Sequence, residues 1–117
     1  MSVLVFGAHP DDIEIGVGGT IAKFVSSGHA VKNILVSIPN QKEIRSKEAE
    51  EANKILGSDL QILNLDTKDL IDTRSLVQIF DSIISSTNPD IIFTHWLHDS
   101  HQDHVLITRA VLASTRK

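Results

Sequence analysis

The chain has 117 residues, which suits one domain, and its 15 acidic and 11 basic residues give a formal net charge of −4. This acidic balance argues against a nucleic-acid binder that works by neutralising phosphates. Apolar residues make up 41% of the chain, enough for a globular core, and no apolar run approaches the roughly 18 residues of a transmembrane segment.

Short runs rich in Val, Ile and Leu alternate with longer segments in which apolar residues have helical spacing. The chain starts directly on the first run, without a basic region or a small-residue cleavage site, so we expect no signal peptide and a cytoplasmic location. Gly28 and Gly57 close the first two helical segments, and Pro89 follows the third. In chain order we expect a strand at 3–6, a helix at 15–27, a strand at 31–38, a helix at 42–56, a strand at 60–63, a helix at 73–86, a strand at 91–93 and a helix from about 102 to the end.

This alternation of strands and helices predicts the fold class. The strands are continuously apolar, which is typical of a parallel sheet covered by helices on both faces. Right-handed crossovers then give an open parallel sheet with strand order 3-2-1-4. We therefore expect residues 1–117 to form a single α/β domain, a Rossmann-like three-layer αβα sandwich.

Polar side chains gather in two segments, each directly after a predicted strand. The first loop (residues 7–14) contains His9, Asp11, Asp12 and Glu14, and the second loop (residues 95–104) contains four of the six histidines. In strand order 3-2-1-4 the first and fourth strands are neighbours, and their carboxyl ends flank the crevice where such folds bind ligands. We therefore expect the two loops to face one another.

Imidazoles and carboxylates at this crevice predict a metal site, because catalytic zinc takes three such protein ligands and keeps one open position. His9, one aspartate of the first loop and one histidine of the second would meet that count. Asp11 and Asp12 are adjacent and cannot both point the same way, so one is free to face the open position. The absence of cysteine excludes thiolate ligands and Cys nucleophiles.

The second loop ends where the last helix is expected to begin. His101 and His104 are three residues apart, so on a helix they can reach the same cavity. Either Asp99 or Asp103 can accept the proton of a ring nitrogen and so fix the orientation of that ring. For His95 two readings stay open, a contact behind the metal ligands and simple hydrogen bonding.

Two motifs in these loops carry a family resemblance. His9-Pro10-Asp11-Asp12, followed by Glu14 and by Gly16-Val17-Gly18-Gly19-Thr20, resembles the opening signature of the PIG-L (LmbE-like) N-deacetylase family. His101-Gln102-Asp103-His104 resembles the second signature of that family, His-x-Asp-His. Between them, Arg45, Glu48 and Leu56-Gly57 are similar to its Arg-x-x-Glu … Leu-Gly segment.

The resemblance implies a metal-dependent hydrolase that removes the N-acetyl group from a GlcNAc-type amino sugar or its conjugate. The metal would be Zn²⁺, with Fe²⁺ as another divalent option. By similarity, His9, Asp12 and His104 would bind the metal, and Asp11 would be the general base toward the water molecule held there. His101 would steady the oxyanion or protonate the amine, Asp103 would orient His101, and Arg45 would contact the substrate.

Two alternatives remain beside this reading. Members of the family are generally longer, so the chain would alternatively be a truncated domain that binds metal or sugar without turnover. In that case a partner chain, a homo-oligomer included, would complete the pocket. His9-x-Asp11 with a remote histidine is also the ligand set of non-haem iron oxygenases. Those enzymes use β-barrel folds, whereas this sequence alternates strands and helices.

Overall fold

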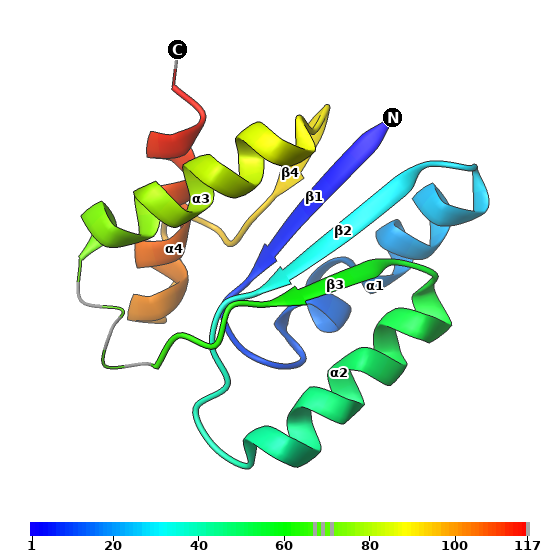
Figure 1. The fold of residues 1–117 in the computed structure, drawn as a ribbon, viewed down its shortest axis with the longest axis horizontal. Coiled ribbons are helices and arrows are strands. Elements are labelled where there is room, and N and C mark those ends of the chain that lie inside the picture. Colours follow the sequence, from blue (N-terminus) through cyan, green and yellow to red (C-terminus); the bar gives the residue numbers. More distant parts are fainter. Residues whose placement is uncertain (67, 69, 71, 117) are drawn as a thin grey trace.

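The first strand of the chain lies in the interior of a parallel sheet (Figure 1). The computed structural model describes residues 1–66, 68, 70 and 72–116. The strands pair in the order β3-β2-β1-β4, every pair parallel, which confirms the predicted topology. The elements in chain order are β1 (Ser2–Gly7), α1 (Asp12–Ser26), β2 (Ala30–Leu35), α2 (Lys42–Leu56), β3 (Asp59–Ile62), α3 (Thr73–Thr87), β4 (Ile91–Phe93) and α4 (Gln102–Ser114).

The alternating side chains of β1 explain the three layers, because successive residues of a strand point to opposite faces. Val3 and Val5 belong to a buried cluster with residues of α1. Leu4 and Phe6 belong to a second cluster with α3 and α4, where the rings of Phe6 and Phe80 lie 4.7 Å apart. Figure 1 shows α1 and α2 on one side of the sheet and α3 and α4 on the other. The predicted αβα sandwich is therefore confirmed.

Two element boundaries close to the first loop differ by three residues from the sequence prediction. β2 ends at Leu35, although Val36 and Ser37 continue to donate hydrogen bonds to the carbonyls of Gly7 and Ala8. α1 begins at Asp12, three residues earlier than predicted, and is interrupted at Val17, whose backbone is not helical (φ −138°). The first turn of α1 is thus a separate short segment that holds Asp12 beside the end of β1.

Helix α3 begins at a side-chain cap. Asp72 caps it, because its carboxylate accepts hydrogen bonds from the backbone N–H groups of Arg74 (2.9 Å) and Ser75 (3.4 Å).

Among the described residues, no helix is both long enough and apolar enough to cross a bilayer.

We expect Asp72→Ala to lower the free energy of unfolding by about 1 kcal/mol, the usual effect of losing such a cap. Urea denaturation of the two proteins measures it. Asp81→Ala is the matched control, because Asp81 is exposed in the middle of the same helix. An equal or larger loss of stability in the control would contradict the capping role of Asp72.

Candidate metal centre

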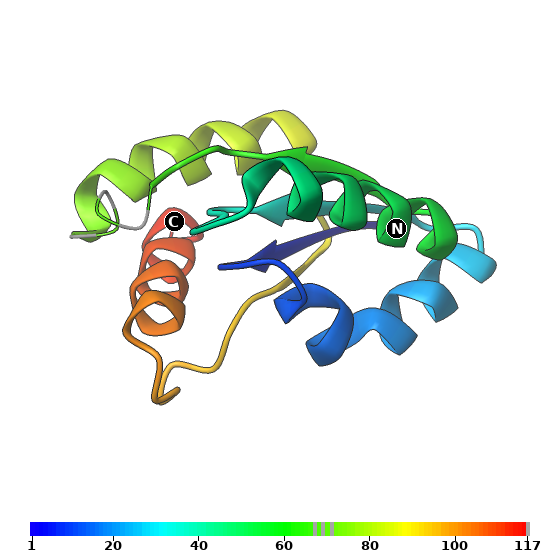
Figure 2. The same ribbon diagram turned by 90° about the horizontal axis from the view of Figure 1, so that it is seen from below.

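The two loops leave the sheet side by side. β1 and β4 are hydrogen-bonded neighbours up to the pair Val5 and Phe93, so the segments that follow start next to each other. Figure 2 shows the segment after β4 running past the start of α1 before it turns into α4. Gly7, the last residue of β1, packs so closely against Ile13 that a Cβ atom there would collide with the isoleucine side chain. The prediction that the first and second loops face one another is confirmed.

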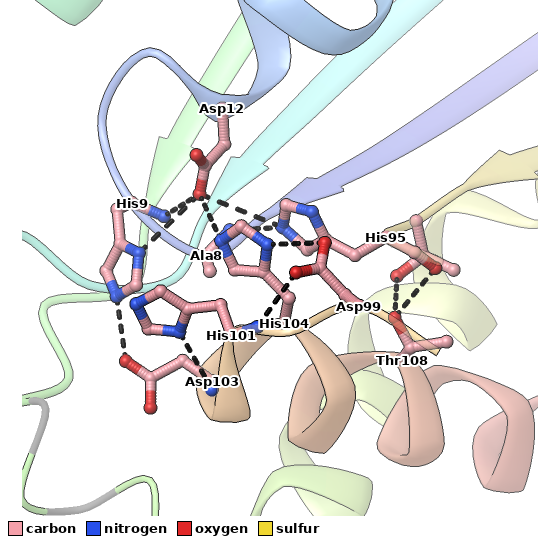
Figure 3. A network of polar contacts seen from close by, with 10 residues as sticks. Ala8, His9, Asp12, His95, Asp99, His101, Asp103, His104 and Thr108 are labelled. Carbon is pink, nitrogen blue, oxygen red and sulfur yellow. Dashed lines mark hydrogen bonds and ion pairs between the residues drawn. The ribbon is translucent and has the colours of Figure 1, made fainter. Parts of the chain in front are cut away.

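Asp12 is the centre of the polar cluster that the loops form (Figure 3). Its Oδ2 lies 3.1 Å from Nε2 of His104 and 3.6 Å from Nδ1 of His9. The same oxygen accepts a hydrogen bond from the backbone N–H of His9 at 2.9 Å, which fixes the carboxylate. One carboxylate oxygen of the first turn of α1 thus faces imidazoles from both loops.

The geometry of these three side chains fits a divalent cation. Tetrahedral zinc with bonds of about 2.0–2.1 Å holds its ligand atoms about 3.4 Å apart. The distances from the Asp12 oxygen to the two nitrogens, 3.1 and 3.6 Å, lie on either side of that value. The donor atoms of His9, Asp12 and His104 all lie within 4.8 Å of one another, on side chains that are 15–23% exposed. Two imidazoles and a carboxylate are also the donor types that zinc prefers.

Each of these histidines has a carboxylate on its other ring nitrogen. Asp99 Oδ2 lies 3.0 Å from Nδ1 of His104, and Asp103 Oδ2 lies 2.8 Å from Nε2 of His9. With a cation bound beside Asp12, such a contact would hold the ring proton on the outer nitrogen and leave the lone pair of the inner nitrogen for the cation. Both rings could then turn an unprotonated nitrogen toward the same cation.

Asp103 is placed differently from what the resemblance implies. Its carboxylate contacts His9 and not His101, because the side chain of this first-turn residue of α4 points toward the loop after β1 (Figure 3). Its backbone N–H instead donates to Nδ1 of His101 at 3.1 Å, as expected where a side chain caps a helix. The amide of Asp103, not its carboxylate, orients His101.

His101 is the N-cap residue of α4 and stands at the exposed side of the cluster. Because its Nδ1 accepts the amide hydrogen of Asp103, the neutral ring carries its proton on Nε2. The ring is nearly parallel to that of His104, with centroids 4.7 Å apart, and lies 5.0 Å from that of His9. His101 can therefore offer a hydrogen-bond donor beside the two inner histidines.

Contacts within the cluster shift the pKa values of His9, Asp12 and Asp99. The hydrogen bond to Asp12 raises the pKa of His9 against the effect of burial, and Asp103 adds to the rise. Burial alone would raise the pKa of Asp12, but the hydrogen bonds from His9 outweigh it and lower that pKa. The backbone N–H of His101 and the ring of His104 lower the pKa of Asp99. A cation therefore competes with a proton on His9, so binding weakens toward acid pH.

Asp11 and Arg45 lie outside this cluster. Asp11 has a left-handed backbone (φ 78°) and is exposed. Together with Glu14, Arg45 and Glu48 it lines a hollow of about 90 Å³ between the first loop and α2. Burial raises the pKa of Glu14 there. Within the described residues, the groups close enough to share a metal ion do not include Asp11.

His95 and Asp99, both in the second loop, make more contacts with the cluster than the sequence analysis predicted. His95 accepts a hydrogen bond from the backbone of Ala8 and stacks on His104, and Asp99 holds the outer nitrogen of His104. His98 and Trp96 contact each other at the surface, where Trp96 is 69% exposed.

Comparison with known proteins identifies the family of the chain. The family model for PIG-L, GlcNAc-PI de-N-acetylase, matches residues 4–115. The chain belongs to the PIG-L family. The chain is also 30% identical over 125 residues to the uncharacterized deacetylase YaiS of Escherichia coli (strain K12), and the match covers 97% of this chain and 68% of YaiS.

Two solved structures show the same fold. The conserved protein TT1542 of Thermus thermophilus superimposes with a TM-score of 0.88 at 29% identity, covering 96% of this chain and 54% of that one. The N,N′-diacetylchitobiose deacetylase of Pyrococcus horikoshii superimposes with a TM-score of 0.86, also at 29% identity, covering 97% of this chain and 48% of that one. The chain thus spans about half the length of these structures.

Proposed function

We propose that the chain binds a divalent cation, Zn²⁺ in the first place, through His9, Asp12 and His104, and hydrolyses the N-acetyl group of a GlcNAc-type amino sugar or its conjugate. The observation that carries the proposal is the convergence of three donor atoms from two distant loops within 4.8 Å. Membership in the PIG-L family and the likeness to a chitobiose deacetylase support the substrate class.

A cation in this position would polarise the acetyl carbonyl and lower the pKa of a water molecule to about 7. Hydrolysis also needs a group that takes a proton from the water and a proton for the departing amine. We assign both tasks to Asp11, because it is exposed, directly precedes Asp12 in the chain and is not one of the three proposed ligands. An Asp11 that has taken the proton from water becomes an acid and can give it to the amine.

In this mechanism His101, Asp103 and Arg45 bind or orient the reacting groups. His101 donates from Nε2 to the oxyanion that develops on the acetyl carbonyl, since its Nδ1 is already occupied by the amide of Asp103. Asp103 orients His9 through Nε2. Arg45 contacts the sugar from the wall of the hollow that it shares with Asp11.

Release of free amine from a panel of N-acetyl sugars tests the proposed function. The panel contains GlcNAc, N,N′-diacetylchitobiose and a GlcNAc conjugate with inositol. We expect amine release from at least one sugar, loss of release with a chelator, and recovery on adding Zn²⁺. Tight zinc binding without release from any sugar would favour the alternative, a metal-binding domain that needs a partner chain. Release that a chelator does not affect would contradict the metal-dependent mechanism.

Asp103→Asn is expected to lower the zinc affinity about 10- to 100-fold, the usual effect of losing a carboxylate behind a ligand histidine. The isosteric change removes the negative charge of the carboxylate that contacts His9 Nε2 and leaves the hydrogen bond from the backbone N–H of residue 103 to His101 in place. Competition with a fluorescent chelator measures the affinity. Asp81→Asn serves as the control, and equal affinities of the two variants would refute the role of Asp103.

A further inference from the structure

We infer that His95 is a positioning residue that ties the two loops together and fixes the plane of the His104 ring. The inference rests on the proposed metal site. The backbone pairing of β1 and β4 ends at Val5 and Phe93, before the first loop begins. Beyond that point Nε2 of His95 accepts a hydrogen bond from the N–H of Ala8 at 3.0 Å. Ala8 directly precedes His9, so this bond holds the first loop against the second.

The ring of His95 also supports the ring of His104. The two rings are stacked, with centroids 3.8 Å apart and planes inclined by only 13° (Figure 3). Asp99 fixes the direction of His104 within its plane through Nδ1, at 3.0 Å. The stack fixes the plane itself, so the two contacts together determine where Nε2 of His104 points.

The backbone of His95 is held from the other side. Thr108, buried in α4 one turn after His104, donates its hydroxyl hydrogen to the carbonyl oxygen of His95 at 2.8 Å. His95 thus contacts the first loop, the ring of His104 and the helix that carries His104. This arrangement sets the separation between His9 and His104.

His95 supports the site without binding the cation itself. Its Nε2 lies 3.9 Å from Oδ2 of Asp12, farther than the nitrogens of His104 and His9. The lone pair of that nitrogen is occupied by the N–H of Ala8. A residue that acts in this way changes the affinity of the site but not the number of imidazoles bound to the metal.

Two substitutions separate the two contacts of His95. Gln has its side-chain oxygen the same number of bonds from Cα as Nε2, so His95→Gln can keep an acceptor for Ala8 while removing the ring. His95→Phe keeps a flat ring for the stack on His104 and leaves the buried N–H of Ala8 without an acceptor. His98→Gln is the matched control, because His98 lies three residues further on in the same loop and is exposed.

The test measures zinc affinity of the full chain by chelator competition and the coordination of zinc by X-ray absorption. We expect His95→Gln and His95→Phe each to lower the affinity about 10- to 100-fold, the range found when contacts behind ligands are lost. Both variants should still show two imidazoles on zinc, and His98→Gln should bind zinc as the wild type does.

Wild-type affinity in both His95 variants would overturn the positioning role. Loss of one imidazole from zinc in His95→Phe would overturn it as well, since His95 would then be a ligand. These outcomes differ from failure of the proposed function, in which the unaltered chain itself binds no zinc. Unfolding of the metal-free variants, followed in parallel, distinguishes a change at the site from a loss of fold.

Discussion

Asp11→Asn is expected to leave zinc bound and to reduce the rate of amine release about 10²- to 10⁴-fold, the usual contribution of a general base. The three donor atoms come from His9, Asp12 and His104, so the substitution removes none of them. Asn has nearly the same shape as Asp but cannot take up a proton from water. The expected signature is a fall in kcat with unchanged zinc content.

Asp12→Asn is the informative comparison for this prediction. Asp12 contacts His9 and His104 through one oxygen, and an amide there weakens both the charge and the geometry of the site. We expect Asp12→Asn to lose zinc and activity together. If Asp11→Asn lost its zinc while Asp12→Asn retained it, the two aspartates would have to exchange roles.

His104→Ala is expected to lower the zinc affinity by more than about 100-fold, because even contacts behind a ligand contribute 10- to 100-fold. The change removes Nε2, which lies 3.1 Å from Asp12, and leaves Asp99 without its imidazole partner. Zinc content after dialysis and chelator competition both measure the loss.

The control for His104→Ala is His98→Ala, an exposed histidine of the same loop. It should retain zinc and activity. Zinc bound by His104→Ala at wild-type affinity would mean that the cation lies elsewhere, for example against His9, His101 and Asp103, whose donor atoms also lie within 4.8 Å of one another.

The sequence predicted the sheet and the position of the site because both follow from the order of apolar runs. Continuous apolar strands separated by helices leave few topologies, and in order 3-2-1-4 the segments after the first and fourth strands must meet. The proximity of His9 and His104 therefore follows from topology, although 95 positions of sequence separate them.

The side-chain contacts within the site could not be predicted from the order of apolar runs. Which nitrogen of His9 meets Asp103 depends on side-chain rotamers and on the exact start of α4. The bond from Ala8 to His95 depends on where the pairing of β1 and β4 stops. A shift of one residue in either element would change these partners without changing the pattern of apolar residues.

The start of α1 shows the same limit. The sequence predicts a helix from about Ile15, whereas the structure has a separate turn from Asp12 that ends at the non-helical Val17. Asp11, with its left-handed backbone, is the N-cap residue that directly precedes this turn. Helical spacing describes the packed part of α1, and it carries no information on a turn that is held by the bonds of Asp12 to the first loop.

Anomalous diffraction at the zinc absorption edge, from crystals grown with Zn²⁺, tests the central claim most directly. We predict one peak per chain, about 2.0–2.2 Å from a ring nitrogen of His9, a carboxylate oxygen of Asp12 and a ring nitrogen of His104. A peak bound by other side chains, or no peak among these three at saturating zinc, would contradict the metal centre on which the proposed deacetylase mechanism depends.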